Sequence, residues 1–157
     1  MDEQESRFLK ELMTGPRVLS LAVLVDGAPL VGLLPFAIKP DLGAAIVHAS
    51  QLARHTRGLG RGAAFGALIH APDAPDADAR QIARVSLEGV VEPLEPGTPA
   101  WDEAQALYFA RFPDSEGIFQ LPGFGLYELR FEQGRLVGGF GFARNLSPET
   151  LRKAATT

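Results

Sequence analysis

The hydrophobic residues of this chain fall into strand-length runs that end at turn residues. Residues 17–25 are almost continuously apolar and partly β-branched, which predicts a strand buried on both faces. Asp26-Gly27 follows, and because both residue types tolerate a positive φ, the pair predicts a two-residue hairpin into a return strand over residues 29–38. Pro35 lies inside that return strand and has no backbone N–H, so we expect a sheet edge, a bulge or a strand end there.

The rest of the chain repeats this pattern, so six or seven strands are expected in all. Alternating or continuous apolar residues predict strands over 44–49, 63–70, 81–94, 124–132 and, after a turn at Gln133-Gly134, 135–142. Gly89 predicts a β-bulge within its strand. Most neighbouring strands can pair as hairpins, which favours a mainly β fold, an antiparallel barrel or curled sheet, over a βαβ array.

Helices are predicted where apolar residues recur at helical spacing behind a capping residue. Phe8, Leu9 and Leu12 share one face of an N-terminal helix that Gly15-Pro16 ends. Thr98 is a good N-cap, and Pro99 suits the first helical position after it. The expected helices cover residues 2–13, 51–60, 99–112 and a short segment after Ser147-Pro148.

Composition and charge narrow the function classes. The net charge of −4 argues against nucleic acid as a partner, because nucleic-acid-binding proteins usually carry a dominant basic surface. The absence of cysteine excludes disulfides and thiolate metal sites and fits a cytoplasmic location. The acidic start of the sequence is unlike a signal peptide, and no apolar run is long enough to span a bilayer, so we expect no membrane association.

The most informative polar residues follow the strand at 44–49. Ser50 stands where the N-cap of the predicted 51–60 helix belongs, and Arg54, His55 and Thr56 lie in its first two turns. Free N–H groups at a helix start, beside a hydroxyl and cationic side chains, form an anion site, and a phosphate suits it because Arg can hold its oxygens by paired bonds. The alternative interpretation is a surface helix whose polar face is basic.

Other kinds of active site have no support. No two histidines are spaced like metal ligands, so no protein metal site is expected. There is no cysteine and no Gly-x-Ser-x-Gly elbow, which removes the usual hydrolase triads. His48 is expected to pack or to point to solvent. His70 closes a strand before a loop, and we favour a surface role for it over haem ligation.

Three stretches in the right order resemble the flavin-binding split-barrel superfamily, typified by pyridoxamine 5'-phosphate oxidase, and within it the haem-utilisation subgroup. Residues 33–37 (LLPFA) resemble the strand whose backbone lies against the flavin ring, residues 50–56 (SQLARHT) resemble the phosphate-gripping turn, and residues 136–141 (LVGGFG), preceded by 121–127, resemble the terminal signature. The resemblance implies a six-stranded antiparallel split β-barrel with flanking helices, a homodimer, and FMN in the groove between the subunits.

The resemblance also assigns roles. It implies that Ser50, Arg54, His55 and Thr56 hold the phosphate and that Phe36 or Phe140 covers the ring. The backbone that faces the ring belongs to Leu33, Leu34, Pro35 and Phe36; for Leu33, Leu34 and Phe36, plain core packing is the alternative.

The sequence departs from the family pattern at several positions. Gly32 replaces a common Ser, Gly58 replaces Asn, and residues 63–66 (AAFG) replace Pro-Arg-x-Ser, so several hydrogen-bond donors expected near the flavin are missing. The sequence ends soon after the signature, so we expect neither the C-terminal domain of the haem-degrading members nor the haem ligand that such a domain carries. The chain is thus expected to form one split-barrel domain, 1–157, with an N-terminal helix (1–15), a barrel (17–144) and a C-terminal helix or tail (147–157).

The sequence therefore predicts an FMN-binding protein that acts as a flavin-dependent oxidoreductase on a small-molecule substrate. No catalytic acid or base is identified, because the flavin carries the chemistry. Two alternatives stay open: a haem-binding or haem-degrading protein, and a dimeric binding module that has lost its cofactor.

Overall fold

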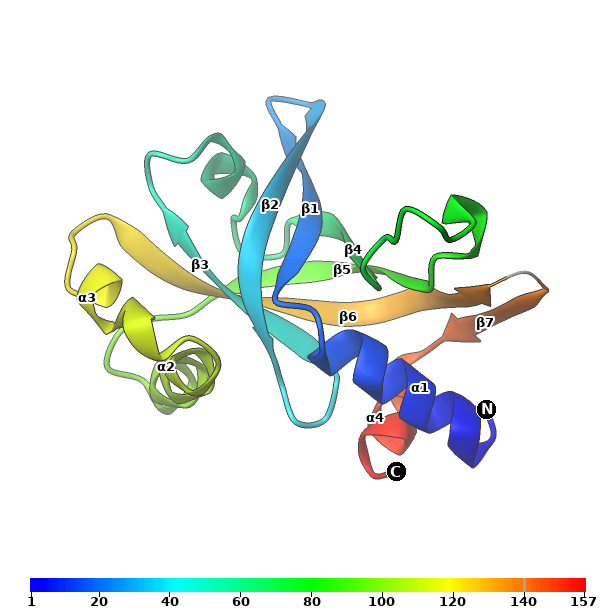
Figure 1. Cartoon of the computed structure of the whole chain (residues 1–157). Coiled ribbons are helices and arrows are strands. Elements are labelled where there is room, and N and C mark those ends of the chain that lie inside the picture. The colour runs from blue at the N-terminus through cyan, green and yellow to red at the C-terminus, as the bar shows by residue number, and fades with distance from the viewer. Residues whose placement is uncertain (140) are drawn as a thin grey trace.

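Seven strands and four α-helices make up the computed structural model, which describes residues 1–139 and 141–157. The strands are β1 (Val18–Val25), β2 (Ala28–Ile38), β3 (Ala44–Ser50), β4 (Ala64–His70), β5 (Arg84–Pro93), β6 (Phe124–Gly139) and β7 (Phe142–Leu146). Their order in the sheet is β3-β2-β1-β4-β5-β6-β7, and β3 also pairs with β6, which closes the first six strands into an antiparallel barrel (Figure 1). The predicted split-barrel fold is confirmed. Phe140, which the resemblance places over the ring, lies outside the described residues.

The β1–β2 hairpin forms as its turn residues predict. Asp26 and Gly27 have φ angles of 53° and 78°, which is the left-handed backbone that a two-residue hairpin needs. The prediction that β1 is buried on both faces is wrong for the chain alone. Only alternate residues such as Leu19 and Leu21 are buried, while Val18 and Leu24 are exposed, because β1 turns one side to the barrel interior and the other outward.

β5 and β6 show why two glycines lie in mid-strand. The register shifts between Glu88 and Gly89, which confirms the predicted bulge. The turn predicted at Gln133-Gly134 is wrong, because β6 continues through it to Gly139. A side chain at Gly134 would place its Cβ 2.7 Å from the carbonyl oxygen of Ser86, so this glycine allows two strands to approach instead of reversing the chain.

The helices flank the barrel in two groups, α1 with α4 and α2 with α3 (Figure 1). They are α1 (Glu3–Thr14), α2 (Pro99–Arg111), α3 (Glu116–Phe119) and α4 (Pro148–Ala155), with 3-10 turns η1 (Arg54–Gly58), η2 (Ala79–Gln81) and η3 (Pro113–Ser115). The N-caps expected at Thr98 and Ser147 are present, and their hydroxyls accept the N–H groups of Trp101 and Thr150. Within residues 1–139 and 141–157, no helix combines the length and hydrophobicity needed to cross a bilayer.

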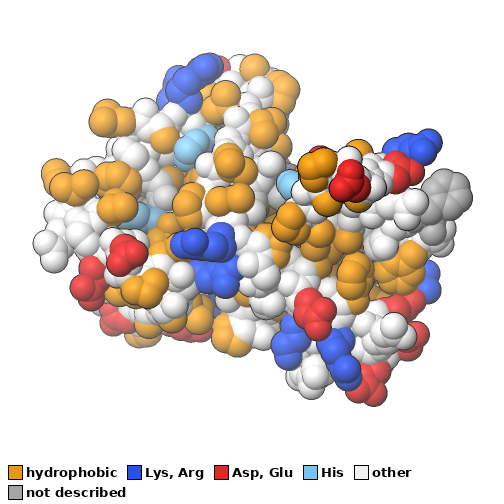
Figure 2. Space-filling model, in the orientation of Figure 1, with side chains coloured by type: hydrophobic (Ala, Val, Ile, Leu, Met, Phe, Trp, Pro, Cys, Tyr) orange, Lys and Arg blue, Asp and Glu red, His pale blue; other side chains and the backbone are white. Residues whose placement is uncertain are grey.

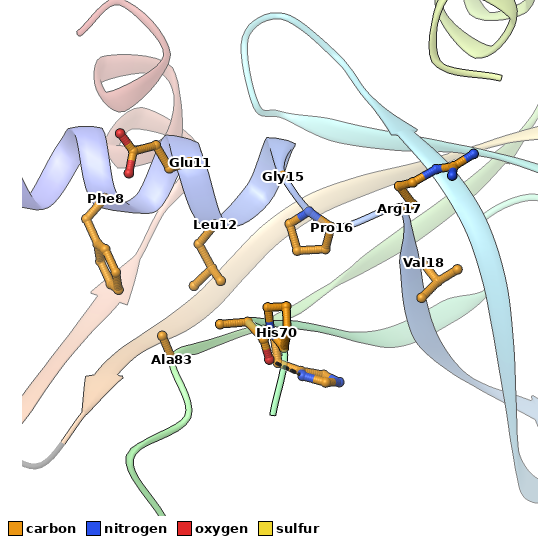
Figure 3. A pocket seen from close by; sticks show the side chains of 11 residues that line it. Phe8, Glu11, Leu12, Gly15, Pro16, Arg17, Val18, His70 and Ala83 are labelled. Atoms are coloured by element: carbon orange, nitrogen blue, oxygen red, sulfur yellow. Dashed lines mark hydrogen bonds between the residues drawn. The ribbon is translucent and has the colours of Figure 1, made fainter. Parts of the chain in front are cut away.

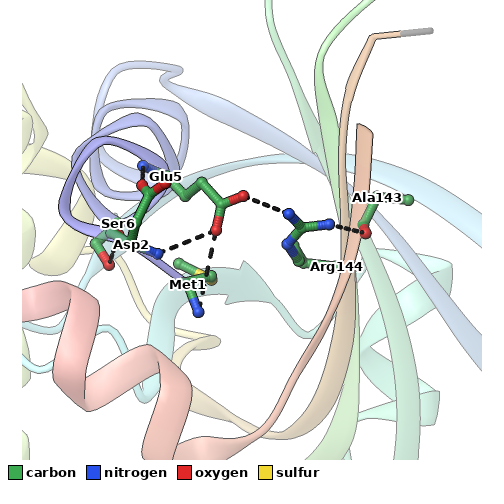
Figure 4. Close-up of polar contacts among 6 residues, drawn as sticks. All are labelled: Met1, Asp2, Glu5, Ser6, Ala143 and Arg144. Carbon is green, nitrogen blue, oxygen red and sulfur yellow. Dashed lines mark hydrogen bonds and ion pairs between the residues drawn. The ribbon is translucent and has the colours of Figure 1, made fainter. Parts of the chain in front are cut away.

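The first helix is fixed to the end of the barrel by one carboxylate. Glu5 accepts the N–H of Asp2 at 3.1 Å as part of a capping box, and it also pairs with Arg144 of β7 at 2.5 Å (Figure 4). Leu9 and Met13 on the inner side of α1 are fully buried in the barrel core. A second, smaller core lies where α2 packs on β2 and β3 around Ile46 and Tyr108.

Candidate functional site

The site begins where β2 and β3 separate. β2 pairs with β1 from Ala28 to Pro35 but with β3 only over Phe36–Ile38, so the strand pairing expected to end near Pro35 does end there on the β3 side. The N–H of Phe36 donates to the carbonyl of Arg17 at 3.2 Å. Because antiparallel residues point their backbone groups alternately to the two sides, the N–H and C=O groups of Val31 and Leu33 face away from β1.

The unpaired backbone groups of Val31 and Leu33 are called the free edge of β2 below. Besides the pairing of β2 with β1, no backbone hydrogen bond involves Val31 or Leu33 in the described part of the chain. Unpaired backbone groups need a partner, which is water or a ligand. The free edge can therefore donate and accept hydrogen bonds with a flat polar molecule.

The turn after β3 faces the free edge, but it is not the helix that the sequence predicts. Ser50 ends β3 and does not cap a helix: its Oγ accepts the N–H of Leu52 at 3.1 Å. Only the five-residue turn η1 follows, and Ala53 precedes it without a side-chain cap. Three glycines within residues 58–62 disfavour any longer helix, and the predicted anion site at a helix N-terminus is therefore wrong in its geometry.

Two side chains of η1 remain available for an anion. Arg54 is exposed, and no ion pair or side-chain hydrogen bond occupies it within the described residues. His55 is half-buried, and a Cβ added to Gly32 would lie 3.1 Å from its Nδ1, so the ring packs directly against β2. Burial lowers the pKa of His55 below its ordinary value of 6.5, which keeps the ring neutral at pH 7 with one N–H to donate.

The two hydroxyls of the predicted site shape the turn. Thr56 is buried, and its Oγ1 donates to the carbonyl of Ser50 at 2.5 Å. Because its single proton is used there, Thr56 can accept a hydrogen bond but cannot donate one to a phosphate. Arg57 pairs with Asp26 at 2.7 Å, which ties η1 to the β1–β2 hairpin.

The four predicted ring-facing residues divide between two environments. Leu34 and Phe36 are 3% and 1% exposed and belong to the barrel core, so the core-packing alternative holds for them and Phe36 does not cover a ring at the surface. Leu33 and Pro35 lie on the face of β2 opposite to Leu34 and Phe36. Both are exposed, Leu33 by 68%. Only the backbone of this segment and its outward side chains can meet a ligand.

The outer face of β1 and β2 is a feature that the sequence analysis missed. The name refers to the surface formed by the exposed apolar side chains of these two strands. They are Val18, Leu24, Val31 and Leu33, which are 44%, 59%, 68% and 68% exposed. Figure 2 shows hydrophobic side chains gathered over these strands. A shallow hollow of about 220 Å3 lies on the same side between β1, the start of β2 and β4. An apolar patch of this kind marks an interaction surface, and its only signal in the sequence was the unbroken apolar run at 17–25.

His48 on β3 belongs to a separate aromatic cluster. Its ring stacks on Phe119 with centroids 3.9 Å apart and lies 4.9 Å from Phe124. Burial lowers the pKa of His48 from 6.5 to about 4, so the ring is neutral at pH 7 and packs as an aromatic side chain. Across the described part of the chain, no three His, Asp or Glu side chains gather into a group that could hold a metal ion.

Comparisons with known proteins show which proteins this chain is similar to. No family model matches the chain. The chain is 28% identical to the heme oxygenase HutZ of Vibrio cholerae over 148 residues, which cover 91% of this chain and 81% of HutZ. A heme-binding protein from Mycobacterium smegmatis superposes with a TM-score of 0.79 at 26% identity, over 96% of this chain and 60% of that chain. A pyridoxinephosphate oxidase-family protein from Clostridium acetobutylicum, 14% identical, superposes with a TM-score of 0.68 over 96% of this chain and 99% of that chain and shares the fold.

The chain has the split-barrel fold and is similar to HutZ and to proteins of the pyridoxamine 5'-phosphate oxidase-like superfamily. The resemblance drawn from residues 33–37, 50–56 and 136–141 is thus confirmed at the level of the superfamily. Within the split barrel, the free edge of β2 and the turn after β3 lie side by side, as the contact of His55 with Gly32 demonstrates.

Proposed function

We propose that this split-barrel protein binds FMN between the free edge of β2 and η1, as a homodimer, and acts as a flavin-dependent oxidoreductase on a small-molecule substrate. The observation that carries the proposal is the unpaired backbone of Val31 and Leu33 on a strand that contacts η1, the turn whose exposed Arg54 has no recorded side-chain partner among the described residues. A flavin offers a polar ring edge and an anionic tail, and these two groups of this chain complement them.

Each part of FMN has a partner of suitable chemistry. The N–H and C=O groups of the free edge suit the alternating donors and acceptors of the ring. Arg54 provides a permanent positive charge for the phosphate and His55 a neutral N–H donor. The hydroxyl proton of Ser50 stays available, because its recorded bond to Leu52 uses an oxygen lone pair. Thr56 contributes by holding the turn in shape.

The departures from the family pattern fit a site that relies on backbone groups. The position where Ser is common is Gly32, and His55 occupies the space that a side chain there would enter. At Gly58, where the subgroup has Asn, a Cβ would lie 2.8 Å from the Cβ of Val23 and 2.9 Å from the carbonyl oxygen of Leu24. Glycines therefore stand at two positions where η1 packs closely, Gly58 against β1 and Gly32 of β2 against His55, and the free edge supplies the donors instead.

The outer face supports the homodimer. Its exposed apolar side chains lie next to the free edge, because Val31 and Leu33 have their backbone at the edge and their side chains on the outer face. A second copy packed on this face would bury them and wall the ligand on its open side. Apolar burial contributes about 25 cal/mol per Å2, which makes such a surface costly to leave in water.

The flavin would supply the electron-transfer chemistry, and the chain would bind and orient it. Leu33 and Pro35 on the outer side of β2 would exclude water from the ring, and Arg54 would fix the phosphate. No acid or base from this chain is required for that division of labour.

Haem is the second candidate ligand, favoured by the relatives named for haem in Vibrio cholerae and Mycobacterium smegmatis. Its iron would need a ligand from this chain, and a neutral histidine is the side chain that commonly serves. The chain has three histidines, of which His48 is stacked between aromatic rings and His55 is packed on Gly32.

The visible spectrum of the purified protein, with mass spectrometry of whatever small molecule is extracted from it, tests the proposal. FMN absorption and the FMN mass support it. A colourless protein that takes up no FMN at micromolar concentration overturns it, and this result would leave haem binding and the cofactor-free dimeric binding module as the remaining candidates.

A further inference from the structure

A cavity of about 600 Å3 lies between α1 and the ends of β1 and β4, and it is called the α1–β4 cavity below. Its volume is within the range of small-molecule sites. Phe8 and Leu12 of α1 extend across it toward Ala83 and His70 (Figure 3). Leu12 is buried in the barrel core and His70 is exposed, so Leu12 belongs to the inner wall and His70 to the mouth.

Hydrogen bonds within the chain hold two walls of this cavity in place. On the side of α1, the guanidinium of Arg111 donates to the carbonyl oxygens of Gly15 and Pro16 at 2.6 and 2.9 Å. On the side of β4, the N–H of Ala71 donates to the carbonyl oxygen of Ala83 at 2.8 Å. Small-molecule sites are usually formed before the ligand arrives, and these bonds give the α1–β4 cavity that property.

The lining includes two charged side chains among the described residues, and both point away from the apolar walls. The guanidinium of Arg17 lies over the ring of Phe112, 5.3 Å from its centroid, and Phe112 is not part of the lining. In Figure 3 the carboxylate of Glu11 lies above the α1 ribbon, whereas Phe8 extends below it into the cavity. A buried charge without a partner is costly, so the cavity suits a neutral ligand with a large apolar body.

His70 adds one hydrogen-bonding atom of a known kind at the mouth. Its Nδ1 lies 2.7 Å from the carbonyl oxygen of Ala71. A carbonyl oxygen only accepts hydrogen bonds, so Nδ1 carries the proton in this contact. In the neutral ring the lone pair then lies on Nε2, which has no hydrogen-bond partner among the described residues. Nε2 can therefore accept a hydrogen bond from a hydroxyl or N–H group of a ligand.

We propose that the α1–β4 cavity binds a neutral, mostly apolar small molecule whose single hydroxyl or N–H group donates to Nε2 of His70. Phe8, Leu12, Pro16 and Val18 would contact the apolar body of the ligand. FMN carries a phosphate and haem carries carboxylates, so neither belongs to this ligand class. The cavity is thus a second site, independent of the function proposed above.

The α1–β4 cavity and the FMN site lie at different ends of β1. The cavity meets β1 at Val18, whereas η1 packs near Val23. Val18 pairs with Pro35, beyond the free edge of β2. Val18 also belongs to the outer face, so a second subunit on that face would border the cavity at this residue. Ligand binding and FMN uptake can therefore be measured separately on the same full-length protein.

Three related fluorescent probes test the proposed ligand class. Phenylnaphthylamine joins two apolar ring systems through one N–H, anilinonaphthalenesulfonate adds a negative charge to the same skeleton, and phenylnaphthalene lacks the N–H. Phenylnaphthylamine is expected to bind saturably with one molecule per chain. The sulfonate should bind about tenfold more weakly, because its charge has no partner between the apolar walls. Equal or tighter binding of the sulfonate would overturn the assignment of a neutral ligand.

The substitution His70→Phe tests the hydrogen bond, because it keeps a flat ring at an exposed position and removes the acceptor. The affinity for phenylnaphthylamine should fall by about threefold to tenfold, the usual effect of losing one neutral hydrogen bond. The affinity for phenylnaphthalene should stay the same, since it has no N–H to donate. An unchanged affinity for phenylnaphthylamine, or an equal loss for both probes, would contradict the role of Nε2.

A cavity-filling variant tests the place of binding. Ala83→Phe should occupy part of the cavity and reduce the affinity for phenylnaphthylamine, because Ala83 lines it. Ala100→Phe, at an exposed position on α2 outside the lining, is the matched control and should leave the affinity unchanged. Circular dichroism checks that both variants fold, and equal affinities in the two would contradict binding in this cavity.

The wild-type titration also separates this inference from the proposed function. A wild type that binds phenylnaphthylamine only non-saturably overturns the inference, whatever the protein does with FMN. FMN uptake by the same sample reports on the free edge and should be unaffected by His70→Phe and Ala83→Phe.

Discussion

The two faces of the β1–β2 hairpin carry similar side chains in opposite environments. Leu34 and Leu21 point into the barrel and are 3% and 0% exposed, while Leu33 and Val31 point outward and are both 68% exposed. One residue along the strand thus separates a core leucine from a surface leucine. The apolar residues on the two sides of this hairpin therefore have different reasons. Those on the inner side form the barrel core, and in the function proposed here those on the outer side pack against a second subunit.

The strongest way to sharpen this comparison is to shorten the two neighbouring leucines. Leu34→Ala should lower the free energy of unfolding by about 2–5 kcal/mol, because it leaves a cavity in a closed core. Leu33→Ala removes the same atoms and should cost less than about 0.5 kcal/mol in a dilute monomer, as surface substitutions do. Urea unfolding at low protein concentration measures both. Equal losses would show that the two faces do not differ as described.

A charge on the outer face should break the assembly without unfolding the chain. Leu33→Asp is expected to convert a dimer into a folded monomer, because an unpaired carboxylate would be buried in the interface. Light scattering gives the mass, and circular dichroism checks the fold. Arg84→Asp, a charge reversal on β5, serves as a control that should keep the dimer. A wild type that is monomeric at high concentration would contradict the proposal that a second subunit covers the outer face.

The polar half of the site should respond to a smaller change. Arg54→Ala should weaken FMN binding by about 10–100-fold, because a charge-assisted hydrogen bond is worth roughly 1.5–3 kcal/mol. Arg57→Ala is the matched control: this neighbouring arginine already pairs with Asp26, so its loss should affect FMN little. Calorimetric titration of both variants gives the affinities. Two equal losses of affinity would assign the phosphate to general positive charge rather than to Arg54.

The smallest expected effect is a pH dependence of stability from His48. Its pKa is about 4 in the folded chain and about 6.5 when unfolded, so its contribution is present above pH 6.5 and is lost as the pH falls from 6.5 to 4. One pKa unit corresponds to about 1.4 kcal/mol, and after a discount for solvent screening of the half-exposed ring we expect a loss of about 1–2 kcal/mol. His48→Phe should flatten that part of the stability–pH curve, and an NMR titration that places the pKa of His48 near 6.5 would contradict the burial argument.

Much of the fold could be predicted from local chemistry. The Asp26-Gly27 pair, Thr98 and Ser147 each act through their own backbone or the next turn, so a short stretch of sequence is sufficient to place them. Two of the errors depend on distant contacts. The helix expected after Ser50 gives way to a short turn packed on β1, and Gly134 is a glycine because a side chain there would meet the carbonyl oxygen of Ser86 on β5.

The candidate site divides in the same way. Arg54 and His55 could be found from their position after a strand, and the effect of Pro35 on strand pairing from its missing N–H. The outer face could not be recognised, because an apolar run reads the same whether a core or a second molecule covers it. The cavity lined by Phe8, Val18 and His70 could not be predicted either, because α1, β1 and β4, which form it, are far apart in the sequence.

Titration of FMN with the full-length protein, followed by the quenching of flavin fluorescence, tests the central claim most directly. The free edge of β2 and Arg54 predict saturable binding with one FMN per chain at micromolar concentration or below. Fluorescence that stays unchanged through a large excess of protein would contradict an FMN site in this barrel.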